Sequence, residues 1–193
     1  MKKFISTSAL TICCLVGLLL LSSNGALKTA KAADGKSKMQ STQADFNEFC
    51  QVMQGRWIVD VIWIADWPGF GKKGDKVTAY AEWNVQDGGA VLTGRFHCGP
   101  GAGTVLVHYD AGVRQIKERV VTSGGTVRDS IVYKRDGKWR LKTTGSNSDG
   151  AKIVGNVTIT ISDEGNTHHR TGSTTIDGKA ADPLRDVFHR IGD

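Results

Sequence analysis

The feature that most constrains the fold is a two-residue alternation of apolar and polar side chains, which runs from Gly55 almost to the end of the chain. Segments such as 77–85 and 92–98 show it, and short glycine-containing turns such as 87–89 separate them. This period is typical of strands with one buried face, and tight turns join antiparallel neighbours. About ten such segments follow one another without a helical pattern between them. The sequence therefore predicts an all-β antiparallel meander, a sandwich or an up-and-down barrel. The barrel is favoured because closure removes exposed sheet edges.

A short amphipathic helix is expected just before this meander. In the stretch 41–55, STQADFNEFCQVMQG, apolar residues recur at helical spacing. Ser41 or Thr42 can cap the start of the helix, and Gly55 ends it. The tail PLRDVFHRI, at 183–191, fits either a last strand or a short helix.

The first 32 residues have the pattern of an export signal. Lys2 and Lys3 precede an apolar run at about 9–21, and Ala-Lys-Ala follows at 30–32. A membrane anchor is disfavoured because the run is shorter than the ~20 residues that a spanning helix needs. We therefore expect a cleaved signal peptide at 1–32, a disordered linker at 33–42 and one barrel domain at 43–193.

Cleavage changes the charge of the chain and its expected compartment. The whole sequence carries a net charge of +6, but the leader contains four lysines and no acidic residue. Without it, 21 basic residues face 19 acidic ones, a net of +2. Such a charge is weak support for binding nucleic acid, and no membrane anchor is expected after cleavage. A periplasmic or secreted protein meets an oxidising environment, where Cys50 and Cys98 either form a disulfide or remain separate buried thiols.

Seven segments carry a resemblance to a known group of proteins: DFNEFCQVM, GRWIV, WPGFGKKGDKVTAYAEW, VHYDAGVRQIKE, SGGT, KWRLKTTGS and DPLRDVFHRI. Over about residues 46–191 the chain resembles the lipocalin-like (calycin) proteins, especially an exported bacterial family of unknown function with a lipocalin-like barrel. The resemblance implies that Trp57 closes one barrel end beneath an arginine of the last strand. Arg190 or Arg185 can supply it by a cation–π contact, and Arg190 is favoured because it shares a face with Phe188.

The expected lumen contains polar as well as apolar side chains. Asp129, for example, shares a strand face with Ile131 and Tyr133. Such groups are costly to bury alone, so they either pair with one another or orient the polar part of a ligand. A register slip at a bulge would instead turn them to solvent. The residues predicted to line a ligand-binding lumen are Trp63, Trp83, Phe96, Glu118, Asp129, Tyr133, His168 and Arg170.

A long loop, ADWPGFGKK at 65–73, places Trp67 and Phe70 beside two lysines. Long loops at a barrel mouth often carry function. The loop is either a lid over the mouth or a plug that buries its aromatic residues in the barrel end.

The sequence contains no convincing metal or catalytic motif. His168 and His169 are strand neighbours that point to opposite faces, so they cannot chelate one ion. No metal and no cofactor are expected, although the resemblance leaves open a haem held through His189 or His168. No nucleophile elbow occurs, and we lean against an enzyme.

Three functions are compatible with the sequence. The first is an exported barrel that binds a small apolar or amphipathic molecule in its lumen. The second is a structural or partner-binding module with a filled barrel and an exposed apolar patch, such as Ile58, Ile62 and Ile64. The third is a haem-binding or enzymatic barrel, where an enzyme requires an acid and a base within hydrogen-bond reach.

Overall fold

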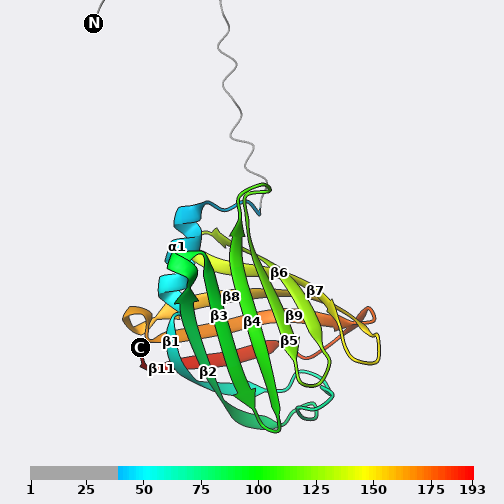
Figure 1. The fold of residues 1–193 in the computed structure, drawn as a ribbon. Helices are drawn as coiled ribbons and strands as arrows, with labels where there is room; N and C mark the ends of the chain where they lie inside the picture. Colours follow the sequence, from blue (N-terminus) through cyan, green and yellow to red (C-terminus); the bar gives the residue numbers. More distant parts are fainter. Residues whose placement is uncertain (1–38) are drawn as a thin grey trace, which may run out of the picture. The chain divides into compact units, whose positions relative to one another are not determined.

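The computed structural model describes residues 39–193, which form a closed antiparallel barrel preceded by one helix (Figure 1). The expected signal peptide at 1–32 and the linker as far as residue 38 lie outside the described residues. Within residues 39–193, no helix combines the length and the apolar character needed to cross a membrane.

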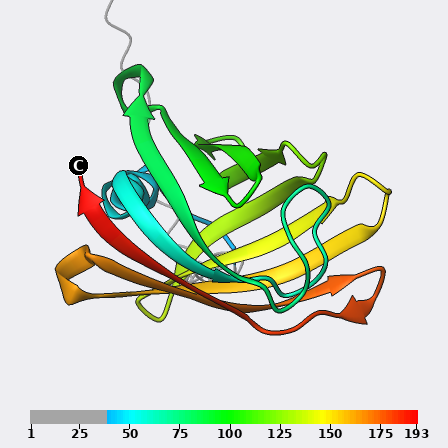
Figure 2. The same cartoon turned by 90° about the horizontal axis from the view of Figure 1, so that it is seen from below.

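Ten strands make the barrel wall, and each pairs with its neighbours in an antiparallel manner. Pairing of β8 with β9, of β9 with β11 and of β11 with β1 closes the ring, which Figure 2 shows from below. The up-and-down barrel predicted from the alternation is confirmed, and the tail is its last strand. The bounds are β1 Gly55–Ile62, β2 Lys76–Gln86, β3 Val91–Cys98, β4 Gly101–Asp110, β5 Gln115–Thr122, β6 Val127–Arg135, β7 Lys138–Ser146, β8 Lys152–Ser162, β9 Thr167–Ile176 and β11 Leu184–Gly192. The two-residue β10, Lys179–Ala180, pairs antiparallel with the end of β9, and single 3₁₀ turns lie at Asp87–Gly89 and Asp163–Gly165.

Helix α1, Gln43–Met53, begins at a capping box. The Thr42 hydroxyl accepts a hydrogen bond from the Asp45 N–H at 3.1 Å, and the Asp45 carboxylate accepts one from the Thr42 N–H at 2.7 Å. Ser41 is buried, and its N–H donates to the Arg114 carbonyl oxygen at 2.8 Å. Ser41 and Thr42, at the end of the stretch predicted as a linker, therefore contact the helix and the barrel.

The barrel end beneath α1 is closed around Trp57. The indole Nε1 of Trp57 donates to the Met53 carbonyl oxygen at 3.0 Å, and the Arg190 guanidinium lies 4.2 Å from the centre of the indole ring. Arg190, rather than Arg185, occupies this position and donates to the carbonyl oxygens of Val52 and Gln54. Gly55 has a φ of +112°, and a Cβ atom there would lie 2.5 Å from Arg190 Nη1. Gly55, two residues before Trp57, thus leaves room for the arginine.

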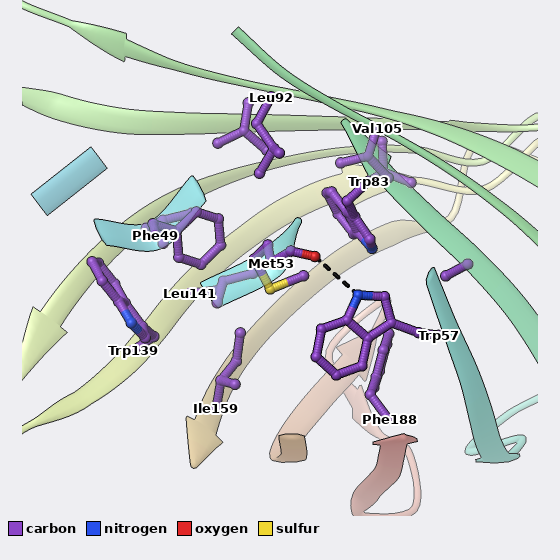
Figure 3. Packing of buried hydrophobic residues seen from close by; sticks show 14 of the residues in the cluster. Phe49, Met53, Trp57, Trp83, Leu92, Val105, Trp139, Leu141, Ile159 and Phe188 are labelled. Atoms are coloured by element: carbon purple, nitrogen blue, oxygen red, sulfur yellow. Dashed lines mark hydrogen bonds between the residues drawn. The ribbon is translucent and has the colours of Figure 1, made fainter. Parts of the chain in front are cut away.

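Large side chains fill the half of the barrel next to α1 (Figure 3). Phe49 packs edge-on against Trp139 with ring centres 5.0 Å apart. The inward residues of the strand segments nearest α1 have almost no exposed surface. They include Leu92, Val107, Ile116, Val132, Trp139 and Ile159. This half is a conventional core, so any ligand must enter the other half.

Candidate ligand cavity

The half of the barrel away from α1 contains a cavity of about 210 Å³. It lies beneath the loop that joins β1 to β2, from which Trp63, Ile64 and Trp67 contribute to its lining. The side chains of Ala79 and Ala81 on β2 are small, and Gly155 on β8 has none. These three positions leave space in a barrel whose other end is filled.

Most of the cavity wall is apolar. Trp63, Trp83 and Phe96 line it together with aliphatic residues of β1, β4, β7 and β8. Phe70 braces two of these rings, with its ring centre 5.7 Å from that of Trp63 and 6.3 Å from that of Phe96. The wall can therefore contact the hydrocarbon part of a ligand.

Four charged residues interrupt this apolar wall. Glu118 comes from β5, Arg128 from β6, Arg170 from β9 and Asp186 from β11. Glu118 accepts a hydrogen bond from the Ser130 hydroxyl at 3.1 Å. Within residues 39–193, no ion pair within 4.0 Å joins either arginine to either acid.

Arg170 and Asp186 stand directly opposite each other on β9 and β11. The Arg170 guanidinium nevertheless lies over the Phe188 ring, 4.0 Å from its centre, and its Nη2 lies 3.6 Å from the Met53 sulfur. The arginine thus uses an aromatic face and a thioether, although a carboxylate is its cross-strand neighbour.

Several buried polar atoms of cavity-lining residues have no hydrogen-bond partner within the described protein. They are Nε1 of Trp63 and Trp83, Nε of Arg128 and Arg170, and Oδ1 of Asp186. Each such atom costs about 1–3 kcal/mol if it stays unsatisfied. Four of the five are donors.

Burial also shifts the pKa values of Arg128, Arg170 and Asp186. Desolvation raises the pKa of Asp186 from 3.8 to about 6, although Arg170 and Arg128 act in the opposite direction. Desolvation lowers the pKa of both arginines, and the charges of Glu118 and Asp186 oppose this shift. Arginine nonetheless keeps its positive charge in proteins. The cavity therefore holds two fixed positive charges and one carboxyl group that titrates close to neutral pH.

The structure brings five of the eight predicted lumen residues to the cavity wall: Trp63, Trp83, Phe96, Glu118 and Arg170. Asp129 and Tyr133 lie elsewhere. Asp129 is on the outer face of β6, where Arg119 Nε donates to its carboxylate at 2.7 Å. The predicted inward orientation of this face is wrong, because the opposite face, with Arg128, Ser130 and Val132, points into the barrel.

His168 faces inward but packs in the filled half. Its ring lies 4.2 Å from that of Trp57, and it is completely buried. His189 is half exposed, with Nε2 3.4 Å from an Asp60 carboxylate oxygen. Neither histidine lines the cavity, so the residues present do not fit a haem held in the lumen. Among residues 39–193, no three His, Cys, Asp or Glu side chains gather as metal ligands.

The loop between β1 and β2 has one aromatic residue placed as in a lid and another placed as in a plug. Trp67 is partly buried and lines the cavity, as a lid residue would. Phe70 is buried as a plug against Gly101, where an added Cβ would lie 2.4 Å from its ring. The two cysteines are separate buried thiols in the structure, and burial raises the pKa of each to about 11.

Sequence reasoning missed Arg128 and Asp186. A signal for Asp186 was present, because the alternation that places Arg190 with Phe188 also places Asp186 on that face. For Arg128 the signal was the outer pair of Arg119 and Asp129, which are direct cross-strand partners and fix the register of β6 against β5.

Comparison of the chain with protein-family models gives no match, and comparison with curated proteins gives no significant one. The functional interpretation therefore depends on the sequence, the barrel and its cavity.

Proposed function

We propose that this protein is an exported, lipocalin-like barrel that binds a small amphipathic molecule in the cavity away from α1. The observation that carries the proposal is a mostly apolar cavity whose lining residues include two arginines, two acids and several buried polar atoms without a protein partner. At about 210 Å³ it suits a ligand smaller than those of typical pockets, which measure roughly 300–1,000 Å³. The basic, apolar and Ala-Lys-Ala segments of the leader support export to the periplasm or the medium.

The alternative of a filled module has less support. Large side chains fill only one half of the barrel. The isoleucines considered as an exposed patch do not form one, since Ile62 and Ile64 both line the cavity and Ile64 is buried, although Ile62 is 41% exposed. A binding role also has more support than a catalytic one, because no hydrogen bond joins Glu118 to Asp186 among the described residues.

The test uses octan-1-ol as an uncharged probe. Binding should change the tryptophan emission, because Trp63 and Trp83 line the cavity. At a probe concentration one hundred times the Kd, binding adds about 2.7 kcal/mol of stability and raises the Tm by several degrees.

Two matched variants locate the site. Ala81→Leu fills the cavity and should abolish the Tm increase, whereas Ala111→Leu adds the same side chain at an exposed turn and should preserve it. Circular dichroism checks that both variants fold. Absence of binding by the unaltered chain, or equal binding by the Ala81→Leu variant, would contradict the proposal.

A further inference from the structure

Two arginines of the cavity wall lack a charged partner within the described protein. Arg128 and Arg170 come from non-adjacent strands, yet both line the same cavity. Each has a buried Nε without a partner in the described protein, and neither is within ion-pair distance of a carboxylate. Burying a positive charge without such a partner is costly. An incoming anion would recover much of this cost.

The two acids restrict which anion fits. Glu118 accepts a hydrogen bond from Ser130, whose hydroxyl lies 2.9 Å from that of Thr143, so the Glu118 side chain is held in place. Asp186 has a hydrogen bond from the Ile62 backbone, but its Oδ1 is buried and has no partner within the described protein. With both acids ionised, the charges of the four side chains sum to zero, and a bound anion gains little electrostatic stabilisation. With Asp186 protonated, one positive charge is left for a monoanion.

We propose that the ligand carries a carboxylate held by Arg128 and Arg170, and that Asp186 takes up one proton as the ligand binds. This inference rests on the proposed function. The guanidinium groups donate to the carboxylate oxygens, and the protonated Asp186 donates its O–H to the ligand or to a bound water. A planar carboxylate suits guanidinium donors. A dianion such as phosphate would leave excess negative charge beside Glu118.

The surroundings of Asp186 support this proton uptake. The charged groups that act on it are Arg170 on the adjacent β9 and Arg128 across the lumen, with Glu118 also in the cavity wall. Cys98 on β3 faces the same cavity but stays a neutral thiol, since its pKa is about 11. Because burial raises the pKa of Asp186 to about 6, the carboxyl group can accept a proton near neutral pH.

The experiment compares octanoate with octan-1-ol by isothermal titration calorimetry. Titrations at about pH 7 in buffers of different ionisation enthalpy measure the protons taken up on binding. We expect nearly one proton per octanoate and none per octanol. Above pH 6, octanoate affinity should fall by up to tenfold per pH unit, whereas octanol affinity should stay constant.

Substitutions test which residue takes up the proton and which residues hold the carboxylate of the ligand. Asp186→Asn should abolish proton uptake and make octanoate affinity independent of pH. Arg128→Met and Arg170→Met should each weaken octanoate binding by roughly 10- to 100-fold without weakening octanol binding, because a charged hydrogen bond contributes about 1.5–3 kcal/mol. Arg119→Met, on the outer face, is the matched arginine control and should change neither.

The possible failures are distinguishable. If neither probe binds, the proposed function is contradicted. If octanol binds but octanoate binds no more tightly at low pH, or binds without proton uptake, only the inference about the carboxylate and Asp186 is overturned. The proton count of the unaltered chain gives this result even if a variant fails to fold.

Discussion

Replacement of Asp186 by asparagine should stabilise the empty barrel at neutral and basic pH. Asparagine resembles the protonated acid in shape and polarity, but it cannot acquire the buried negative charge. In the native chain that charge forms within the cavity wall, next to apolar residues and without a hydrogen bond to Oδ1. The stability gained by the variant therefore measures the cost of ionising Asp186.

The size of this effect follows from the pKa of Asp186. A rise from 3.8 to about 6 is about two units, and each unit corresponds to about 1.4 kcal/mol, which gives about 3 kcal/mol. Because the folded-state pKa is the higher one, the folded state holds the proton more tightly than the unfolded state. This contribution to stability is complete below about pH 4 and is lost as the pH rises through 6.

Urea unfolding followed by tryptophan fluorescence between pH 4 and pH 8 measures the effect. The difference in unfolding free energy between Asp186→Asn and the native chain should shift by about 3 kcal/mol in favour of the variant across this range. Asp129→Asn is the control, because Asp129 is an exposed partner of Arg119 and such pairs contribute roughly 0.2–1 kcal/mol. A difference that does not vary with pH, or that favours the native chain at pH 8, would refute the reasoning.

Two further predictions concern the closed end of the barrel. Burial, with Arg170 and Arg190 nearby, lowers the pKa of His168 to about 3, so its contribution to stability is complete above pH 6.5 and is lost as the pH falls toward 3. His168→Phe should remove that dependence in urea unfolding, and an unchanged pH profile would count against it. Gly55→Ala should lower the Tm more than Gly137→Ala, because both glycines have positive φ but only at Gly55 would the Cβ meet Arg190. Equal losses in a thermal melt would show that contact with Arg190 does not matter.

The alternation predicted the wall of the barrel well where apolar residues dominate the inner face. Trp57, Trp83 and Phe96 face inward on β1, β2 and β3, as the pattern indicates. The same reasoning gave the wrong face on β6. There Ile131 and Tyr133 point outward, while the inward face carries the polar Arg128 and Ser130. A strand that contributes polar side chains to the cavity wall does not obey the rule that its more apolar face is buried.

The arrangement of the charged groups could not be predicted in the same way. Alternation assigns a side chain to a face, but contacts across the lumen depend on how the ring closes. Arg170 and Asp186 are cross-strand neighbours that do not pair, because the guanidinium packs on Phe188 and approaches Met53 of the helix. Such a choice between partners depends on tertiary packing, which a single strand does not encode.

Native mass spectrometry of the protein purified from its own cells tests the central claim most directly. If the cavity is a ligand site, the spectrum should contain the processed polypeptide with a small acidic molecule bound, and Ala81→Leu should lose that adduct while Ala111→Leu keeps it. A bare polypeptide in every preparation, or an adduct that persists unchanged in Ala81→Leu, would contradict the assignment of this cavity as a ligand site.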